Sequence, residues 1–180
     1  MTATLNTQDT GLQDVAGKAW ATVIDKQTTR TDNTADATGK SDSIAGTWVL
    51  NVKADGPLQK MTDQGNPAGD SIDGAILTFN NTSSGQTQDV FDLTAEEQDQ
   101  DFVTSGDATP VTDVTKNLTL PLSTDDTNHP VANAVAGEGE GADVFGWKKT
   151  DIKLTMPTSA TVSNAVYETT LTWTLSTGIN

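Results

Sequence analysis

Residues 167–175 alternate between two kinds of side chain, and this constrains the fold more than any other stretch of the chain. In an extended chain, successive side chains point to opposite sides, so every second residue shares a face. One face of this stretch carries Tyr167, Thr169, Leu171, Trp173 and Leu175. The other carries Glu168 and three threonines. The pattern predicts a β-strand with one face in an apolar core and the other in water.

Residues 47–54 repeat this period of two. One face carries Trp48, Leu50, Val52 and Ala54, and the other carries Thr47, Val49, Asn51 and Lys53. Short apolar stretches rich in β-branched and aromatic side chains favour strands in the same way. They predict further strands at residues 19–24, 75–79, 117–122, 143–147 and 152–156.

Polar turns separate these predicted strands. Glycine, proline and asparagine gather at residues 55–57, 65–67, 80–85 and 137–141, and such clusters mark tight turns. The chain has no cysteine, so disulfides cannot staple the fold. Many short strands with frequent turns are typical of a sandwich or barrel. We therefore predict an all-β fold, an antiparallel β-sandwich or barrel-like sandwich with long polar loops and at most one or two short helices.

Two polar stretches lie outside the strand pattern. Residues 95–102 suit either a short helix or an acidic surface loop, because Thr94 and Glu97 have the spacing of a helix capping box. Residues 28–43 have almost no apolar side chains and are predicted to form a mobile loop. A chain of 180 residues hides roughly 70% of its unfolded surface, so residues 1–180 are predicted to form a single domain.

The charge of the chain excludes two classes of partner. Ten basic residues face 25 acidic ones, giving a formal net charge of −15. Affinity for nucleic acid and for anionic lipid comes mainly from lysine and arginine, so neither is expected as a partner. The sequence also has no apolar stretch of membrane-spanning length, so no direct membrane insertion is expected. It does not start with a signal peptide, so a secreted protein would have lost its leader.

One short motif occurs twice. Thr47-Trp48-Val49-Leu50 and Thr172-Trp173-Thr174-Leu175 both read Thr-Trp-x-Leu, in a chain with only four tryptophans. In a strand, this spacing places the tryptophan and the leucine on one face. Each copy therefore presents a continuous apolar ridge.

These motifs resemble the WxL family of Gram-positive surface proteins, whose domain has a proximal and a distal Trp-x-Leu motif. Three further segments are similar to the family: residues 73–78, the glycine-rich residues 135–141 followed by Gly146-Trp147, and the region from Ile152 through the distal motif. The resemblance extends from about Thr47 to the end of the chain. Residues 1–27 match the family poorly.

The resemblance implies a non-catalytic module that attaches non-covalently to the Gram-positive cell wall. Its expected partner is peptidoglycan or another cell-wall glycan, and its expected location is extracellular and cell-wall associated. The family also implies an alternative, a protein-interaction module. That module would dock a companion, membrane-anchored WxL-interacting protein or a host matrix protein.

Trp48, Leu50, Trp173 and Leu175 are the ligand-binding or site-organising candidates. An exposed indole offers a large surface for stacking on sugars or docking a partner. Alternatively, both tryptophans belong to the core, because each lies among the inward-facing residues of its strand. We predict that both are buried and organise the site without touching the ligand.

Trp147, Lys148 and Lys149 are secondary candidates. The two lysines form the only adjacent basic pair in a strongly acidic chain, and they could meet teichoic acid phosphates or peptide-stem carboxylates. Two solvated lysines at the end of a strand are the favoured interpretation.

No residue pattern points to catalysis or to a metal. His129 is the sole histidine, and it lacks a nucleophile motif around it, so it is predicted to be a loop residue. Asp70 and Asp73, or Asp125 and Asp126, could offer oxygens to Ca²⁺, but no segment has the spacing of a calcium loop. We therefore expect no catalytic residue, no metal and no cofactor.

Overall fold

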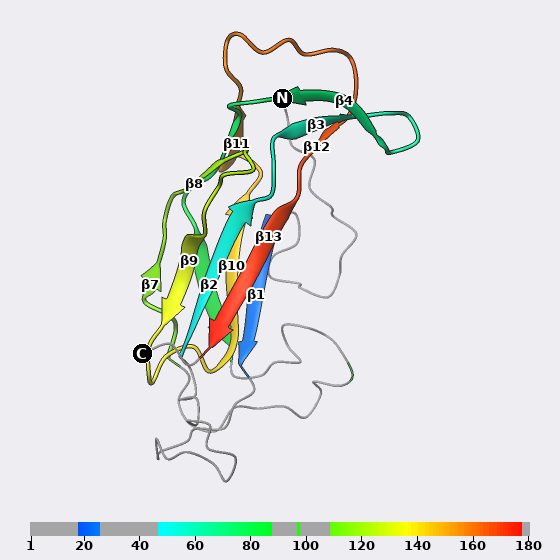
Figure 1. Ribbon diagram of the computed structural model, residues 1–180. Coiled ribbons are helices and arrows are strands. Elements are labelled where there is room, and N and C mark those ends of the chain that lie inside the picture. The colour runs from blue at the N-terminus through cyan, green and yellow to red at the C-terminus, as the bar shows by residue number, and fades with distance from the viewer. Residues whose placement is uncertain (1–17, 26–46, 88–96, 98–108, 178–180) are drawn as a thin grey trace.

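The computed structural model describes residues 18–25, 47–87, 97 and 109–177. These ranges form 13 strands in four antiparallel sheets, which confirms the predicted all-β fold. Figure 1 shows two layers, with β9, β2 and β13 in front of β10 and β1. Within the described ranges, no helix has the length and apolar character needed to cross a membrane.

The front layer is a four-stranded sheet that contains both Trp-x-Leu motifs. Its strands, in spatial order, are β13 (Leu171–Thr177), β2 (Trp48–Ala54), β9 (His129–Ala134) and β7 (Asp113–Val114). Buried and half-buried residues alternate strictly along β2, as its period of two predicts. β2 therefore lies in the middle of the sheet with one face in the core.

Two three-stranded sheets form the other layer. The first has the order β1 (Lys18–Asp25), β10 (Gly141–Lys148) and β6 (Ser83–Thr87). The second has the order β11 (Ile152–Thr155), β5 (Ile76–Phe79) and β8 (Leu118–Pro121). Only short turns separate β5 from β6 and β10 from β11. Asn80 N–H donates to the Asp151 carbonyl across these turns (2.8 Å), so the two sheets continue into each other.

A third small sheet covers one end of the sandwich. It has the order β12 (Tyr167–Glu168), β3 (Leu58–Met61) and β4 (Pro67–Ile72), and it lies at the top of Figure 1. Beneath it is a separate apolar cluster formed by Ala54, Leu58, Ile72, Ala75 and Leu122.

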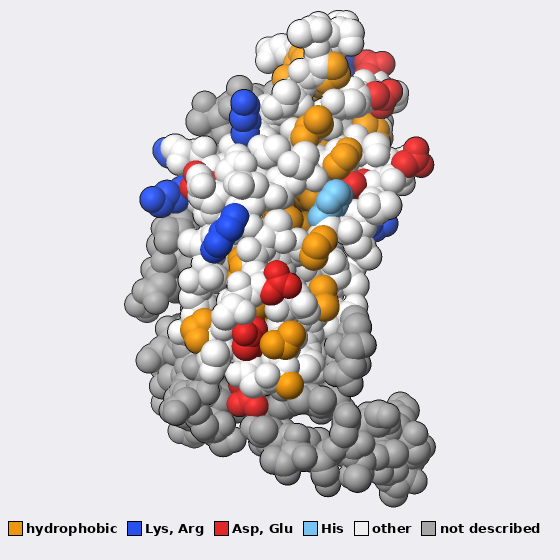
Figure 2. All heavy atoms as spheres, turned by 90° about the vertical axis from the view of Figure 1, so that its left-hand side faces the viewer, with side chains coloured by type: hydrophobic (Ala, Val, Ile, Leu, Met, Phe, Trp, Pro, Cys, Tyr) orange, Lys and Arg blue, Asp and Glu red, His pale blue; other side chains and the backbone are white. Residues whose placement is uncertain are grey.

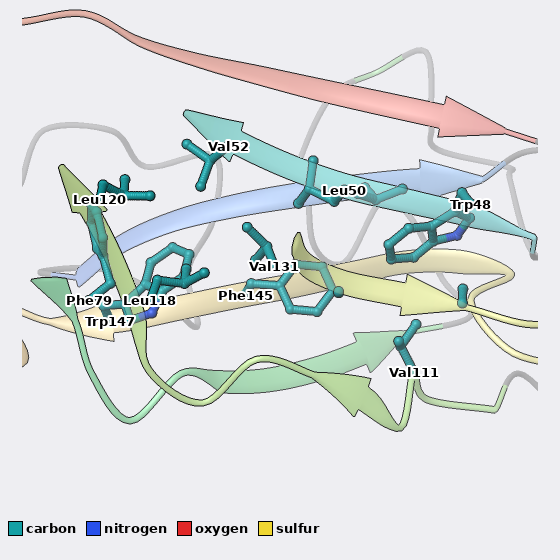
Figure 3. Close-up of a cluster of buried hydrophobic side chains, with 13 residues drawn as sticks. Trp48, Leu50, Val52, Phe79, Val111, Leu118, Leu120, Val131, Phe145 and Trp147 are labelled. Atoms are coloured by element: carbon teal, nitrogen blue, oxygen red, sulfur yellow. The ribbon is translucent and has the colours of Figure 1, made fainter. Parts of the chain in front are cut away.

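The main core lies between the two layers. In Figure 3, Trp48, Leu50 and Val52 point from β2 toward Phe145 and Val131. The aromatic side chains Phe79 and Trp147 fill the other end of the same cluster. Burial of this apolar surface is the main driving force for packing the layers together.

The strands predicted at residues 19–24, 47–54, 75–79, 117–122, 143–147 and 152–156 are all present. The predicted strand 167–175 is instead divided between β12 and β13, because its two ends pair with different strands, β3 and β2. Two hydrogen bonds hold the bend between them. Thr169 Oγ1 donates to the Gly56 carbonyl (2.8 Å), and Asp55 N–H donates to the Thr170 carbonyl (3.0 Å).

Five strands were not predicted: β3, β4, β6, β7 and β9. β6 (Ser83–Thr87) also begins within residues predicted to form the turn 80–85, so that prediction was wrong from Ser83 onward. The predicted mobile loop 28–43 lies outside the described residues. So does the predicted helix or loop 95–102, except for Glu97.

Candidate functional site

The structure brings the two Trp-x-Leu motifs together on neighbouring strands. β13 pairs antiparallel with β2, so Trp173 is opposite Val52 and Leu175 is opposite Leu50. Side chains opposite each other in such a pair share a face of the sheet. The apolar ridges of both motifs therefore lie side by side and face the opposite layer.

Trp48 is a core residue, as predicted. Its side chain is 2% exposed and meets Phe145 edge to face, with the ring centroids 6.1 Å apart. The indole Nε1–H donates to the Gly139 carbonyl (3.1 Å). A buried indole needs such a partner, because an unpaired buried donor is costly. Leu50 is buried beside it, so neither residue can touch a ligand.

The glycine-rich loop between β9 and β10 is built around the indole of Trp48. Gly139 has a positive φ of 71°, which glycine adopts far more readily than other residues. A Cβ at this position would lie 2.7 Å from Trp48 Nε1 and 2.7 Å from Ala134 Cβ. The loop therefore needs glycine here both for its backbone conformation and for its close approach to the indole.

We expect Gly139→Ala to lower the free energy of unfolding by about 3 kcal/mol, since left-handed backbone strain and overpacking each cost roughly 1–3 kcal/mol. Urea unfolding measures the loss. Gly137→Ala is the matched control, because Gly137 also has a positive φ (88°), but a Cβ added there would meet no atom within 4 Å. Equal losses in the two variants would contradict a role for contact with Trp48.

Trp173 and Leu175 are exposed, so the prediction that Trp173 is buried was wrong. The exposed fractions are 38% for Trp173 and 48% for Leu175. Both side chains are on the inward face of the sheet, but β13 is the edge strand of that sheet. A face at the edge of a layer is covered less completely than one in the middle. The distal motif thus forms an apolar rim at the edge of the core.

Trp147 supports this rim from inside. Its ring centroid is 6.2 Å from that of Trp173 and 5.1 Å from that of Phe79. Its Nε1–H donates to Thr82 Oγ1 (3.0 Å). Trp147 itself is fully buried, because it lies on the central strand of its sheet. Its ring therefore packs against the indole of Trp173 from the core side.

Lys148 and Lys149 are exposed at the end of β10, as the favoured interpretation of two solvated lysines requires. Lys148 borders a small cavity of about 370 Å³, together with Asn81 and Asp151. On the face shown in Figure 2, most of the visible lysine side chains lie toward the upper left, with an acidic side chain among them, and other acidic side chains are scattered over the face. Neither Trp173 nor Leu175 lines any of the three described cavities, so none of these cavities connects the lysine pair with the Trp173 rim.

His129 begins strand β9, so its prediction as a loop residue was wrong. Its Nε2 lies 2.8 Å from Asp126 Oδ1, and Asp126 Oδ2 accepts a hydrogen bond from Ala54 N–H (2.8 Å). Burial raises the pKa of Asp126, but the hydrogen bonds from Ala54 N–H and His129, the charge of His129 and a hydrogen bond from Thr127 N–H together hold the pKa below its ordinary value. Figure 2 shows the histidine ring at the surface. This arrangement joins β9 to the end of β2 and is structural.

Asp143 is a buried acidic residue that sequence reasoning missed. It lies on the inward face of β10 and is 2% exposed. Burial is the main cause that raises its pKa to about 7, and the nearby charges of Asp25 and Glu138 raise it further. Hydrogen bonds from Val111 N–H and the Gln86 side chain lower the pKa, but by less. Among the described residues, its Oδ2 has no hydrogen-bond partner. The sequence held one signal that this residue is buried, because it lies between apolar residues in a predicted strand.

The described residues bring no three or more histidine or acidic side chains together as metal ligands. At the Trp-x-Leu motifs, the groups exposed to solvent are the indole of Trp173, the side chain of Leu175 and the backbone polar atoms of the edge strand β13. Such a surface can stack, exclude water and accept backbone hydrogen bonds.

Two comparisons with known proteins found nothing, and one found a family. A family model described as WxL domain surface cell wall-binding matches residues 3–178. This range includes residues 3–27, so the family model extends over a stretch that was predicted to match the family poorly. No curated protein and no solved structure matches the chain.

Proposed function

Because this chain belongs to the WxL family of surface cell wall-binding domains, we propose that peptidoglycan is the wall component it binds. Family membership makes the chain a non-catalytic module located at the cell wall. We propose further that residues 1–180 act as one binding domain and that the attachment is non-covalent.

The observation that carries this proposal is the exposed distal motif. Trp173 and Leu175 present apolar surface at the edge of the core, and the buried ring of Trp147 holds the Trp173 indole in place. A rigid, partly exposed indole can stack on the apolar face of a sugar and loses little entropy on binding. Trp48 and Leu50 organise this surface from within the sheet, because β2 pairs with β13 along its whole length.

The net charge of −15 favours stacking over electrostatic attraction as the basis of binding. A cell wall with teichoic acid is itself anionic, so the chain gains no long-range steering toward it. We therefore propose contacts made by stacking and hydrogen bonding, with weak affinity at each site.

We expect the domain to co-sediment with purified Gram-positive sacculi after teichoic acid has been removed. Trp173→Ala is expected to reduce the retained fraction about tenfold or more, as for a central aromatic contact worth more than about 1.4 kcal/mol. Retention is expected to be unchanged or improved by moderate salt. Circular dichroism of each variant verifies that the fold is intact.

Val135→Ala is the matched control for loss of an exposed apolar side chain. Val135 is 53% exposed and follows β9, on the opposite side of β2 from β13. We expect this variant to be retained as well as the unchanged protein. Equal retention of the unchanged protein, Trp173→Ala and Val135→Ala would show that the contact with the wall lies elsewhere on the domain. If the unchanged protein were not retained on stripped sacculi, peptidoglycan would be excluded as its receptor.

A second candidate function is docking of a companion WxL-interacting protein or a host matrix protein. It is favoured by β13 being an edge strand, because among the described strands only β2 pairs with it. An edge strand can accept a strand from a partner through main-chain hydrogen bonds. This function predicts a stoichiometric complex in solution without any glycan, which size-exclusion chromatography with a purified candidate partner would detect.

A further inference from the structure

A polar pocket lies at the end of the sandwich that carries the small sheet β12-β3-β4. It has a volume of about 650 Å³ and lies between β3, β4, Tyr167 and the chain before β12. This volume is within the range of about 300–1,000 Å³ that is usual for small-ligand sites. The distal motif does not line it. The pocket is therefore separate from the surface proposed above.

Tyr167 forms a fixed aromatic wall of this pocket. Its hydroxyl oxygen accepts a hydrogen bond from Ser163 N–H (3.1 Å) and lies 3.1 Å from Ser163 Oγ. The side chain also packs against the second apolar cluster. Hydrogen bonds at one end of the ring and apolar packing along it define the ring's orientation. An aromatic wall that is already oriented costs little entropy when a ligand stacks on it.

The rest of the wall offers closely spaced donors and acceptors. Lys60 Nζ lies 3.3 Å from Asp70 Oδ2, and Ser71 Oγ donates to Asp73 Oδ1 (3.2 Å). These side chains occur on adjacent strands or in the turn that follows them. Each carboxylate has a second oxygen and further lone pairs for a ligand hydroxyl. Vicinal hydroxyl groups of a sugar match such paired acceptors.

The charge of the pocket distinguishes among cell-wall ligands. Its charged lining residues are one lysine and two aspartates, so it does not favour phosphate or carboxylate groups. An uncharged ligand with many hydroxyl groups avoids this repulsion, and hydrogen bonds from hydroxyls to carboxylates are stronger than neutral ones.

We propose that this pocket binds a neutral, hydroxyl-rich glycan, with a sugar ring against Tyr167 and its hydroxyls on Asp70 and Asp73. The proposal rests on the wall-binding function above and supplies a second contact with the glycan strand. Two weak sites on one chain increase the overall affinity without strengthening either one.

Titration of the isotope-labelled domain with a soluble N-acetylglucosamine tetrasaccharide tests the pocket without the wall. We expect saturating NMR shifts at the backbone amides of Gly69, Ser71 and Ser163, with a millimolar dissociation constant. Asp73→Asn is expected to weaken this binding about tenfold, because it replaces a charge-assisted hydrogen bond with a neutral one. Asp63→Asn is the matched control, since Asp63 is exposed in the same β3–β4 hairpin but does not line the pocket, and it is expected to leave the binding unchanged.

Shifts that are confined to the Trp173 rim, or no shifts at all, would overturn the pocket proposal and leave the sacculus experiment to decide the proposed function. Equal affinity of Asp73→Asn and Asp63→Asn would overturn it as well. Conversely, saturable shifts in the pocket would support it even if the domain failed to co-sediment with stripped sacculi. The two proposals can therefore fail independently.

Discussion

Replacing Trp48 with alanine is expected to lower the free energy of unfolding by about 3–5 kcal/mol, the usual cost of removing a large aromatic side chain from a core. The change removes the edge-to-face contact with Phe145. It also leaves the Gly139 carbonyl without its indole donor, which adds the cost of an unpaired buried acceptor. Since a small domain has only about 5–15 kcal/mol of stability, the variant is expected to unfold at a much lower urea concentration.

Trp173→Ala is the matched comparison for the stability loss of Trp48→Ala. Trp173 belongs to the same kind of motif but lies at the exposed edge, so its removal is expected to cost only roughly 1–2 kcal/mol. Urea unfolding followed by circular dichroism measures both variants. A loss for Trp173→Ala as large as that for Trp48→Ala would contradict the different roles of the two motifs.

The stability of the domain is expected to fall by about 4 kcal/mol between about pH 4 and pH 7 because of Asp143. The folded-state pKa is about 7, and the ordinary value is 3.8. Between these values the unfolded chain releases this proton, whereas the folded protein keeps it. Stability then decreases as pH rises, by about 1.4 kcal/mol for each pH unit across this window, and levels off above the folded-state pKa.

Asp143→Asn is the test of this pH dependence. The amide cannot ionise, so the variant is expected to lose the slope between about pH 4 and pH 7 and to be more stable than the unchanged protein at pH 7. Asp126 does not confuse the result, because its lowered pKa removes stability only as pH falls below its ordinary value of 3.8. Urea unfolding measures the free energy of unfolding of both proteins over this range of pH. If it fell with pH at the same slope in both, the result would contradict the role of Asp143.

The sequence predicts the strands that carry apolar side chains at alternate positions, and it misses those that do not. β2 and β13 were recognised because burial of one face requires this alternation. β6 contains only serine, glycine, glutamine and threonine, and five of the six residues of β4 are exposed. Such strands are held by backbone hydrogen bonds to a neighbour. β9 contains Pro130 and pairs with β2 across a register shift, so its pattern is interrupted.

The candidate site could be predicted only in part, for a related reason. Alternation along β13 places Trp173 and Leu175 on the inward face, but it does not tell how far the opposite layer extends over them. Similarly, the two lysines after Trp147 suggested a solvent-exposed end of a strand, although Trp147 itself lies in the middle of a sheet. The pocket beside Tyr167 is assembled from three strands and a loop, and no spacing within one segment reveals it.

The pairing of β2 with β13 also determines when the front sheet can close during folding. Thr172 and Asp55, at one end of this pair, are 117 residues apart in the chain and are joined by a hydrogen bond. Contacts between such distant segments form slowly, because a long loop must close before they give any stabilisation. β2 therefore stays unpaired on one side until the distal motif arrives. The four-stranded front sheet therefore cannot be completed before the distal motif is available, whereas the pairing of β2 with β9 does not depend on it.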